Sequence, residues 1–358
     1  MNSHYYGLIL AGGRGTRFWP RSRKRSAKQV LNVVGERSLI QATAERLAPV
    51  IPPERLWILT NEHLRGIILK QLPEVPRNQV LAEPVQRNTA PAIGLAAQIL
   101  HSADPDAVMG VFPSDHVVGK PAVYRQVIKA AFKGATAGNL MVVGIQPRWP
   151  ETGYGYIEFP SGTQAGASGI VPVLHFHEKP QLAKAEQYVA SGNFYWNSGM
   201  FFWRANVLLD QLRQHLPKTA TILGSLPRFG GRSFAAALKK AFPLCENISI
   251  DYAVLEKASN VCGVAAPDFG WNDVGSWNAV YELLPRDAAG NVAPPDSVLL
   301  DSLNNFVDAR GKMVALLGVN DLIVVDTPDA LLVASRAQAQ RVGEVLKTLE
   351  SRNRHDLL

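Results

Sequence analysis

The sequence predicts an α/β fold, with a mostly parallel sheet flanked by helices, followed by a small β-rich domain. Over residues 1–145, apolar runs of strand length alternate with helical patterns, which favours a parallel sheet covered on both faces. From about residue 290, short β-type runs are separated by turns. The apolar content of 47% and charged content of 19% are typical of a folded globular chain.

The first part of the chain contains the alternating elements. The predicted strands are Tyr6–Ala11, Leu56–Thr60, Gln79–Ala82, Ala107–Phe112 and Leu140–Ile145. The predicted helices between them are Ser38–Val50, His63–Gln71, Thr89–His101 and Ala122–Ala137. Ligands of such sheets bind beyond the carboxyl ends of the strands, so functional loops should follow the strands.

The alternation loosens after about residue 148. Turn-rich segments suggest strands and loops laid over the sheet as a substrate lid: Thr152–Phe159, His175–Pro180 and Tyr195–Phe202. Further helices are expected at Leu182–Ser191, Val207–Leu216 and Phe234–Ala241. Arg286–Pro295 has the composition of a linker, and we therefore expect domains at residues 1–288 and 289–358.

The second domain should consist of short strands and one final helix. The strand candidates are Ser297–Leu300, Asn305–Val307, Met313–Leu317, Leu322–Val325 and Ala330–Val333, and the helix is Arg336–Glu350. A solenoid fragment fits this pattern, although no internal repeat fixes its period.

The loop after the first strand is the most informative segment. Its sequence, AGGRGTR, contains three glycines and two arginines, and seven basic residues fall between Arg14 and Lys28. Glycine lets backbone N–H groups approach an anion, so the loop predicts a nucleotide triphosphate site, with a solvated basic turn as the alternative. Phe18 stands where a dinucleotide fingerprint needs glycine, and the chain has no Gly-Lys-Ser/Thr triplet. These two facts argue against a dehydrogenase and a P-loop ATPase.

Charge and cysteine content limit the class of protein further. The net charge of +7 equals the number of cations in this one segment, which favours a local anionic ligand over nucleic acid. All apolar runs are too short for a membrane span, and a strand so near Met1 leaves no room for a signal peptide. Cys245 and Cys262 are expected to be free thiols in a reducing cytoplasm.

Two acids are candidates for holding Mg²⁺. Asp115 follows the predicted strand that ends at Phe112, and Asp273 lies in GWNDVGSW. Carboxylates from distant segments would hold one or two ions against a triphosphate. Each has a structural alternative: an Asx turn or helix cap for Asp115, and aromatic packing for the segment around Asp273.

Further polar residues could contact a second substrate. Lys28 and Lys179 could bind phosphate, and the side chains of Asn197 and Glu158 suit sugar hydroxyls, although plain sheet and turn roles remain open. His175 and His177 have metal-ligand spacing, but nothing nearby in the sequence completes a set, so we interpret them as strand histidines. No G-x-S-x-G elbow supports hydrolase chemistry.

Taken together, the motifs resemble those of the sugar-nucleotidyltransferase family, within it the mannose-1-phosphate guanylyltransferases. In family order they are GGRGTRFWPRSR, EPVQRNTAPAI, FPSDH, TGYGYIE, HEKP, YWNSGMFFW, SIDYAVLE and WNDVGSW, spanning residues 8–277. The resemblance implies a Rossmann-like nucleotidyltransferase fold with a C-terminal left-handed β-helix. Alanine stands at 27 where similar proteins usually have proline, which implies a less rigid loop and a less fixed Lys28, and phenylalanine at 18 replaces the more usual leucine.

The resemblance also implies roles for individual residues. The implied catalytic residues are Arg17, Lys28, Asp115, Lys179 and Asp273, with Asp115 and Asp273 as the Mg²⁺ ligands. The implied nucleotide-binding residues are Leu10, Ala11, Gly12, Gly13, Gly15, Thr16, Arg17, Glu83, Arg87, Asn88, Ser114 and Asp115. The implied sugar-phosphate-binding residues are Gly155, Glu158, Glu178, Lys179 and Asn197.

The implied activity is Mg²⁺-dependent transfer of GMP from GTP to mannose 1-phosphate, giving GDP-mannose and pyrophosphate. Two alternatives stay open: a related enzyme for another sugar or base, and a GDP-sugar sensor without activity. A homodimer is expected from the family, with no nucleic-acid or membrane partner. The extra isomerase domain of bifunctional relatives is not expected.

Overall fold

The computed structural model describes residues 2–166 and 168–358, which form two compact units. Unit 1 comprises Met1–Gly12, Ala44–Ser114 and Val118–Trp271. Unit 2 comprises Gly13–Thr43, Asp115–Val117 and Asn272–Leu358. Each unit therefore draws on segments that are far apart in the sequence, and each has its own hydrophobic core.

Unit 1 is built on one mixed sheet, in which the strand order is β3-β2-β1-β4-β10-β6-β11-β8. Strands β1 to β4 are mutually parallel, as are β6 and β11, whereas β10 is antiparallel to β4 and β6. The strands are β1 (Tyr5–Leu10), β2 (Leu56–Asn61), β3 (Val80–Glu83), β4 (Val108–Pro113), β6 (Leu140–Ile145), β7 (Tyr156–Glu158), β8 (Val171–Pro172), β9 (His175–His177), β10 (Phe194–Arg204) and β11 (Val261–Ala266). The mostly parallel α/β sheet is thus confirmed.

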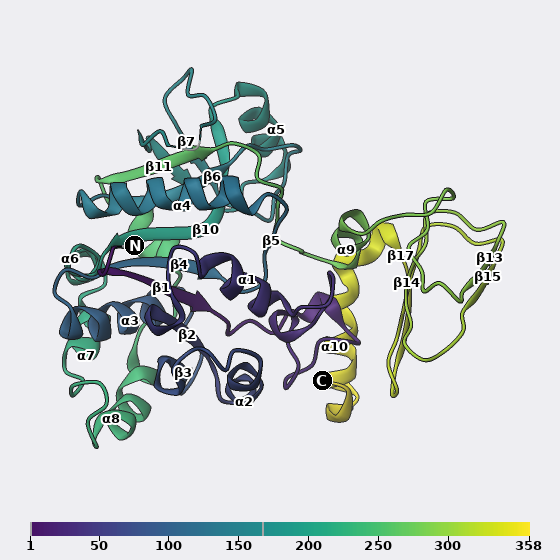
Figure 1. The fold of residues 1–358 in the computed structure, drawn as a ribbon, viewed down its shortest axis with the longest axis horizontal. Helices are drawn as coiled ribbons and strands as arrows, with labels where there is room; N and C mark the ends of the chain where they lie inside the picture. The colour runs from purple at the N-terminus through teal and green to yellow at the C-terminus, as the bar shows by residue number, and fades with distance from the viewer. Residues whose placement is uncertain (1, 167) are drawn as a thin grey trace. The chain divides into compact units, whose positions relative to one another are not determined.

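Helices cover both faces of this sheet (Figure 1). On β10, Phe202 contacts Phe132 of the helix Pro121–Thr136, while Trp203 lies in the core cluster shared with the helix Thr89–Ala103. Adjacent strand residues point to opposite faces, so the two helices lie on opposite sides. The helices are α1 (Leu39–Leu47), α2 (Glu62–Gln71), α3 (Thr89–Ala103), α4 (Pro121–Thr136), α5 (Leu182–Ser191), α6 (Ala205–His215), α7 (Pro217–Gly224) and α8 (Phe234–Ala241).

The prediction of a lid over the sheet is wrong for Tyr195–Phe202. This segment forms most of β10, an interior strand of the sheet, and β7 and β9 extend the same sheet through β10. The turn-like residues mark a register shift between Asn197 and Phe201, with Gly199 at φ +70°. A β-bulge therefore explains the polar interruption of an otherwise apolar strand.

Unit 2 contains the short C-terminal strands as two parallel pairs. β13 (Val298–Leu300) pairs with β15 (Ala315–Leu317), and β14 (Phe306–Asp308) pairs with β16 (Leu322–Asp326). Val298 lies opposite Ala315 and Phe306 opposite Ile323, a separation of 17 residues in both pairs (315 − 298 and 323 − 306). This constant offset is the period that the sequence did not reveal. β17 (Leu331–Ser335) adds to β16 antiparallel.

Buried asparagines bind neighbouring coils of this region together. Asn305 is fully buried, and its Nδ2 donates to Asn291 Oδ1 at 3.1 Å and to the Val319 carbonyl at 2.9 Å. Its Oδ1 accepts from the Leu322 amide at 2.9 Å. Beyond β17, the chain is helical over the range predicted for the final helix, but the first part is a 3₁₀ segment, Arg336–Val342, that leads directly into α10 (Gly343–Ser351).

The basic loop belongs to unit 2 and is held by tryptophans. Phe18 and Trp277, the first residue of α9 (Trp277–Leu283), lie with ring centroids 5.0 Å apart. The Trp277 indole donates to the Trp19 carbonyl at 3.1 Å, and the Trp19 indole donates to the Leu357 carbonyl at 3.0 Å. The structure thereby explains the two tryptophans of GWNDVGSW in part: Trp277 fixes the loop.

Two short strands each contain a point where the chain passes from one unit to the other. The short strands β5 (Val117–Val118) and β12 (Trp271–Asn272) lie at boundaries of the units. Among the described residues, no helix combines the length and apolarity needed to cross a membrane.

Candidate functional site

The carboxyl ends of β1 to β4 meet at one edge of the unit 1 sheet. Leu10 at the end of β1 is paired with Leu59 of β2 and Pro113 of β4. Ala11 is buried, with its amide donating to the Leu59 carbonyl at 2.7 Å, and Gly12 follows it. Ser114, also buried, follows β4. The predicted nucleotide-binding positions of this unit therefore begin at this edge, as expected for a parallel sheet.

Glu83 lies beside Gly12 at this edge. A Cβ added to Gly12 would be 3.5 Å from Glu83 Oε2, so the glycine leaves the carboxyl close to the backbone. Within the described part of the chain, Glu83 Oε1 is buried and has no hydrogen-bond partner. Burial raises the pKa of Glu83 to about 8. A buried carboxyl with an unused oxygen is ready to pair with a polar ligand.

Arg87 and Asn88 follow β3, and their side chains make different hydrogen bonds. The Arg87 guanidinium donates to the Pro243 carbonyl, while its Nε is buried without a partner among the described residues. Asn88 has φ +62° and directly precedes α3 as its N-cap, where its Oδ1 accepts from the Thr89 amide at 2.9 Å. Asn88 thus has a visible structural role as a helix cap.

In unit 2, the glycine loop folds closely onto Lys28. Gly15 has φ +61°, and a Cβ there would clash with the Lys28 Cβ. Both the left-handed backbone and this contact require glycine. Thr16 then begins a short 3₁₀ turn, Thr16–Phe18, which positions Arg17. Gly13 has open space around it, so its backbone is accessible.

Lys28 connects the two predicted metal-binding segments. Its ammonium is 2.8 Å from Asp115 Oδ2 and 2.7 Å from the backbone carbonyl of Asp273, and the residue is only 5% exposed. Burial opposes ionisation of Asp115, but the charges of Lys28 and His116 outweigh it and lower the Asp115 pKa. Asp115 is therefore an anion at neutral pH.

Asp273 is held by an unusual backbone. The next residue, Val274, is fully buried with φ +50°, a left-handed conformation that β-branched residues rarely adopt. A Cβ added to Gly275 would be 3.0 Å from Asp273 Oδ2 and 3.5 Å from Arg17 Nη1. Arg17 and the Asp273 carboxylate therefore border the same point beside Gly275.

Unit 2 thus gathers four of the five predicted catalytic residues. Arg17, Lys28, Asp115 and Asp273 come from three distant segments. The acceptors around the Lys28 ammonium are carboxylate and carbonyl oxygens, the ligand type that Mg²⁺ prefers. Such a donor set fits a hard divalent cation together with the anionic groups of a nucleotide.

The fifth residue, Lys179, lies in unit 1 with a second polar group. Its ammonium is 2.6 Å from Glu178 Oε1, and its backbone has φ +46°. Burial lowers the Lys179 pKa, but the hydrogen bond and charge of Glu178 outweigh this and raise it, so Lys179 is a cation. A Cβ on Gly155 would lie 2.5 Å from Glu178 Oε2 and 3.4 Å from the Asn197 Cβ. Gly155, Glu178, Lys179 and Asn197 are thus brought together.

Asp251 joins this group, and the sequence analysis assigned it no role. Asn197 Nδ2 donates to Asp251 Oδ1 at 3.0 Å. Burial, together with the charge of Glu178, raises the pKa of Asp251 to about 6. Asp251 lies in SIDYAVLE, one of the motifs that carry the resemblance, and this motif could have identified it as a candidate site residue.

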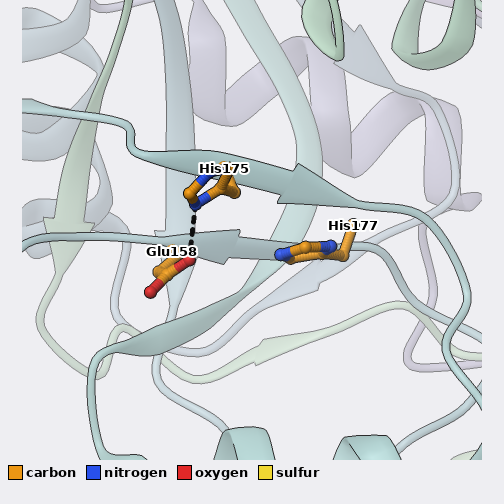
Figure 2. Close-up of side chains that lie close together, drawn as sticks. All are labelled: Glu158, His175 and His177. Atoms are coloured by element: carbon orange, nitrogen blue, oxygen red, sulfur yellow. Dashed lines mark hydrogen bonds and ion pairs between the residues drawn. The ribbon is translucent and has the colours of Figure 1, made fainter.

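Glu158 lies apart from this group. In the β7–β9 pair, Glu158 is opposite His175 and Ile157 is opposite Phe176, so Glu158 and Phe176 are on different faces of the pair. Phe176 Cε1 approaches the Gly155 position at 3.4 Å, whereas Glu158 Oε2 is 2.8 Å from His175 Nδ1 (Figure 2). The structure therefore separates Glu158 from Gly155, Glu178, Lys179 and Asn197.

Comparisons with known proteins agree with this organisation. A family model described as nucleotidyl transferase matches residues 6–290, and one described as a mannose-phosphate isomerase/GMP-like β-helix domain matches residues 296–349. The mannose-1-phosphate guanylyltransferase of Klebsiella pneumoniae is 37% identical over 98% of this chain and 74% of its own length. The xanthan biosynthesis protein XanB of Xanthomonas campestris pv. campestris (strain B100) is 40% identical over the same shares.

A solved structure supports the fold. A protein of Thermus thermophilus, described as mannose-1-phosphate geranyltransferase, superposes with a TM-score of 0.86 at 34% identity. The match covers 97% of this chain and 99% of that one. The predicted combination of a nucleotidyltransferase fold with a β-helix-like C-terminal domain is confirmed.

Proposed function

Since the chain belongs to the nucleotidyl transferase family, we propose that it transfers GMP from GTP to α-D-mannose 1-phosphate, releasing pyrophosphate. The relatives named mannose-1-phosphate guanylyltransferase support the choice of substrates. The observation that carries the proposal is the cluster of Arg17, Lys28, Asp115 and Asp273, in which two cations and two acids meet at a glycine loop.

The reaction needs alignment and charge neutralisation rather than a protein nucleophile. A phosphate oxygen of the sugar phosphate attacks the α-phosphorus, and the bond from that phosphorus to the pyrophosphate leaving group breaks in line. Arg17 and Lys28 would neutralise charge on the nucleotide phosphates, with the amides of Gly13 and Gly15 around them.

Asp115 and Asp273 would hold the Mg²⁺ of this reaction, and Mg²⁺ would neutralise charge on the phosphate oxygens. In the structure, the Lys28 ammonium already bonds to one of these carboxylates, that of Asp115, and to the backbone carbonyl of Asp273, so it would have to share Asp115 or move toward the phosphates. The positive charge of Lys28 would thus pass from Asp115 to the phosphates when a nucleotide binds.

The remaining residues would set the specificity of binding. Lys179 would bind the sugar phosphate, while Glu178 and Asn197 would bind hydroxyls of the sugar. Glu83 would contact the base: its buried and unused oxygen supports that role, since guanine offers N–H donors. Arg87 and Asn88 would help to shape this part of the site.

A pyrophosphate-release assay with four nucleotides and several sugar phosphates tests the activity. We expect the highest kcat/KM with GTP and mannose 1-phosphate, and a loss on the order of 10²–10³ in turnover for Asp115→Asn. A preference for UTP and glucose 1-phosphate would favour a related enzyme. Absence of turnover with every pair, despite measured GDP-mannose binding, would favour a sensor.

We also propose that the protein forms a homodimer through its C-terminal strands. Large apolar side chains are exposed there, among them Leu317 of β15 at 71%, Leu331 of β17 at 59% and Leu300 of β13 at 55%. Exposed apolar groups of this size are typical of interfaces. Sedimentation should detect a dimer that Leu317→Glu weakens, and a monomeric wild type would contradict the assignment.

A further inference from the structure

Three metal-ligating side chains share one face of the β7–β9 pair. Glu158 is directly opposite His175, and His177 follows two residues later on the same strand face. One ligand atom from each residue can be chosen so that all three lie within 4.8 Å of one another (Figure 2). The strand pairing therefore supplies the third ligand that the sequence around the two histidines lacks.

The chemistry of this set differs from that of the magnesium ligands. Two imidazole nitrogens and one carboxylate oxygen form a three-ligand set that Zn²⁺ uses together with a water molecule. Imidazole also suits Ni²⁺ and Cu²⁺, whereas Mg²⁺ prefers oxygen ligands throughout. Zinc bonds of about 2.0–2.1 Å place tetrahedral ligand atoms roughly 3.3 Å apart. The 2.8 Å between His175 Nδ1 and Glu158 Oε2 is close to that separation.

Neighbouring side chains hold two of the ligands in place. The His177 ring stacks on Tyr188, with centroids 5.2 Å apart, and lies 5.9 Å from Phe194. The side-chain Nδ2 of Asn193 is 3.5 Å from Glu158 Oε1 and 3.0 Å from the Phe159 carbonyl. It therefore contacts the carboxylate oxygen that is not bonded to His175. Such supporting contacts orient ligands and strengthen metal sites.

The site is also accessible from solvent. The His175 side chain is 68% exposed, and that of Glu158 is 22% exposed. A metal ion can therefore reach the cluster without opening the core, and a water molecule can complete its coordination.

We propose that Glu158, His175 and His177 form a binding site for Zn²⁺ or a similar transition-metal ion, separate from the Asp115 and Asp273 cluster. The ion replaces the hydrogen bond between His175 and Glu158 and joins β7 to β9. His177 directly precedes Glu178 and Lys179, so bound metal fixes the strand that leads into the predicted sugar-phosphate group. Metal binding by these three residues does not require the proposed reaction.

Calorimetric titration of the full-length chain, carrying no affinity tag, with Zn²⁺ in excess Mg²⁺ tests the site. We expect one tight equivalent per chain, an affinity at least about tenfold lower in His175→Gln, and no tight binding in the His175→Gln/His177→Gln variant. The matched control is His63→Gln, which removes an exposed histidine of α2 and should leave the affinity unchanged.

If a variant loses its near-ultraviolet circular dichroism, the variant has not folded normally, and Co²⁺ binding by the wild-type protein then tests the site. One equivalent of Co²⁺ should then give the strong visible absorption of a four-coordinate site. Weak six-coordinate absorption, no Zn²⁺ uptake over excess Mg²⁺, or unchanged binding in the folded double variant would each overturn the proposal.

Discussion

Replacing Glu83 by glutamine should make the protein more stable at neutral and alkaline pH. The burial that raises the Glu83 pKa from 4.5 to about 8 keeps this carboxyl protonated in the folded protein, while the unfolded chain loses the proton near pH 4.5. Between these values the folded state binds more protons than the unfolded state. The free energy of unfolding of the wild type must therefore fall as the pH rises through this window.

The expected size follows from the width of the window. Each unit of pKa difference is worth about 1.4 kcal/mol, so a rise from about pH 5 to about pH 7.5 should cost the wild type up to about 3 kcal/mol. Glutamine has no proton to lose and keeps the same shape. The stability difference between Glu83→Gln and wild type should thus grow across this range and become constant above about pH 8.

Urea unfolding followed by tryptophan fluorescence, from about pH 5 to about pH 9, measures this difference. Glu74→Gln is the matched control, because it makes the same carboxyl-to-amide change at an exposed position of the same unit. A difference for Glu83→Gln that is flat across the range would show that Glu83 is ionised in the folded protein, and the reasoning from burial would fail.

Three further changes test the cluster in unit 2 and the group around Lys179. Lys28→Met should destabilise the fold by up to about 3 kcal/mol, because Asp115 loses its buried counter-charge; an unchanged urea midpoint would contradict this. Gly15→Ala should cost about 2–3 kcal/mol, since the methyl group meets Lys28 in a left-handed turn, and differential scanning calorimetry measures it. Lys179→Ala should raise the KM for mannose 1-phosphate at least about tenfold; a defect confined to the KM for GTP would reverse its assignment.

The first sheet strands and their helices were predictable because their patterns are local. β6 and α8 coincide with their predicted ranges, and β1 to β4 begin and end within one residue of theirs. The middle of the chain was less predictable, because β10 joins residues far apart in the sequence and its bulge at Asn197 looks like a turn. Only the sheet itself, and no local pattern, specifies such pairing.

The candidate site shows the same division. Asp115 and Asp273 were identified by residue type and by the motifs around them, but the Lys28 ammonium that links their segments is a tertiary contact. The grouping of Glu158 with the sugar-binding positions followed its place in TGYGYIE. Strand alternation instead turns its carboxylate toward His175, a difference that depends on the register of β7 against β9.

The contacts of the basic loop have a consequence for any shortened form of the protein. Trp19 and Arg23 both donate to the Leu357 carbonyl, Arg21 is paired with Asp308, and Arg17 bonds to Gln340 at 2.6 Å. Removing residues 289–358 would strip the loop of these partners and expose its aromatic side chains. The C-terminal region therefore holds the basic loop in its conformation, and sequence changes in either segment should require compensating changes in the other.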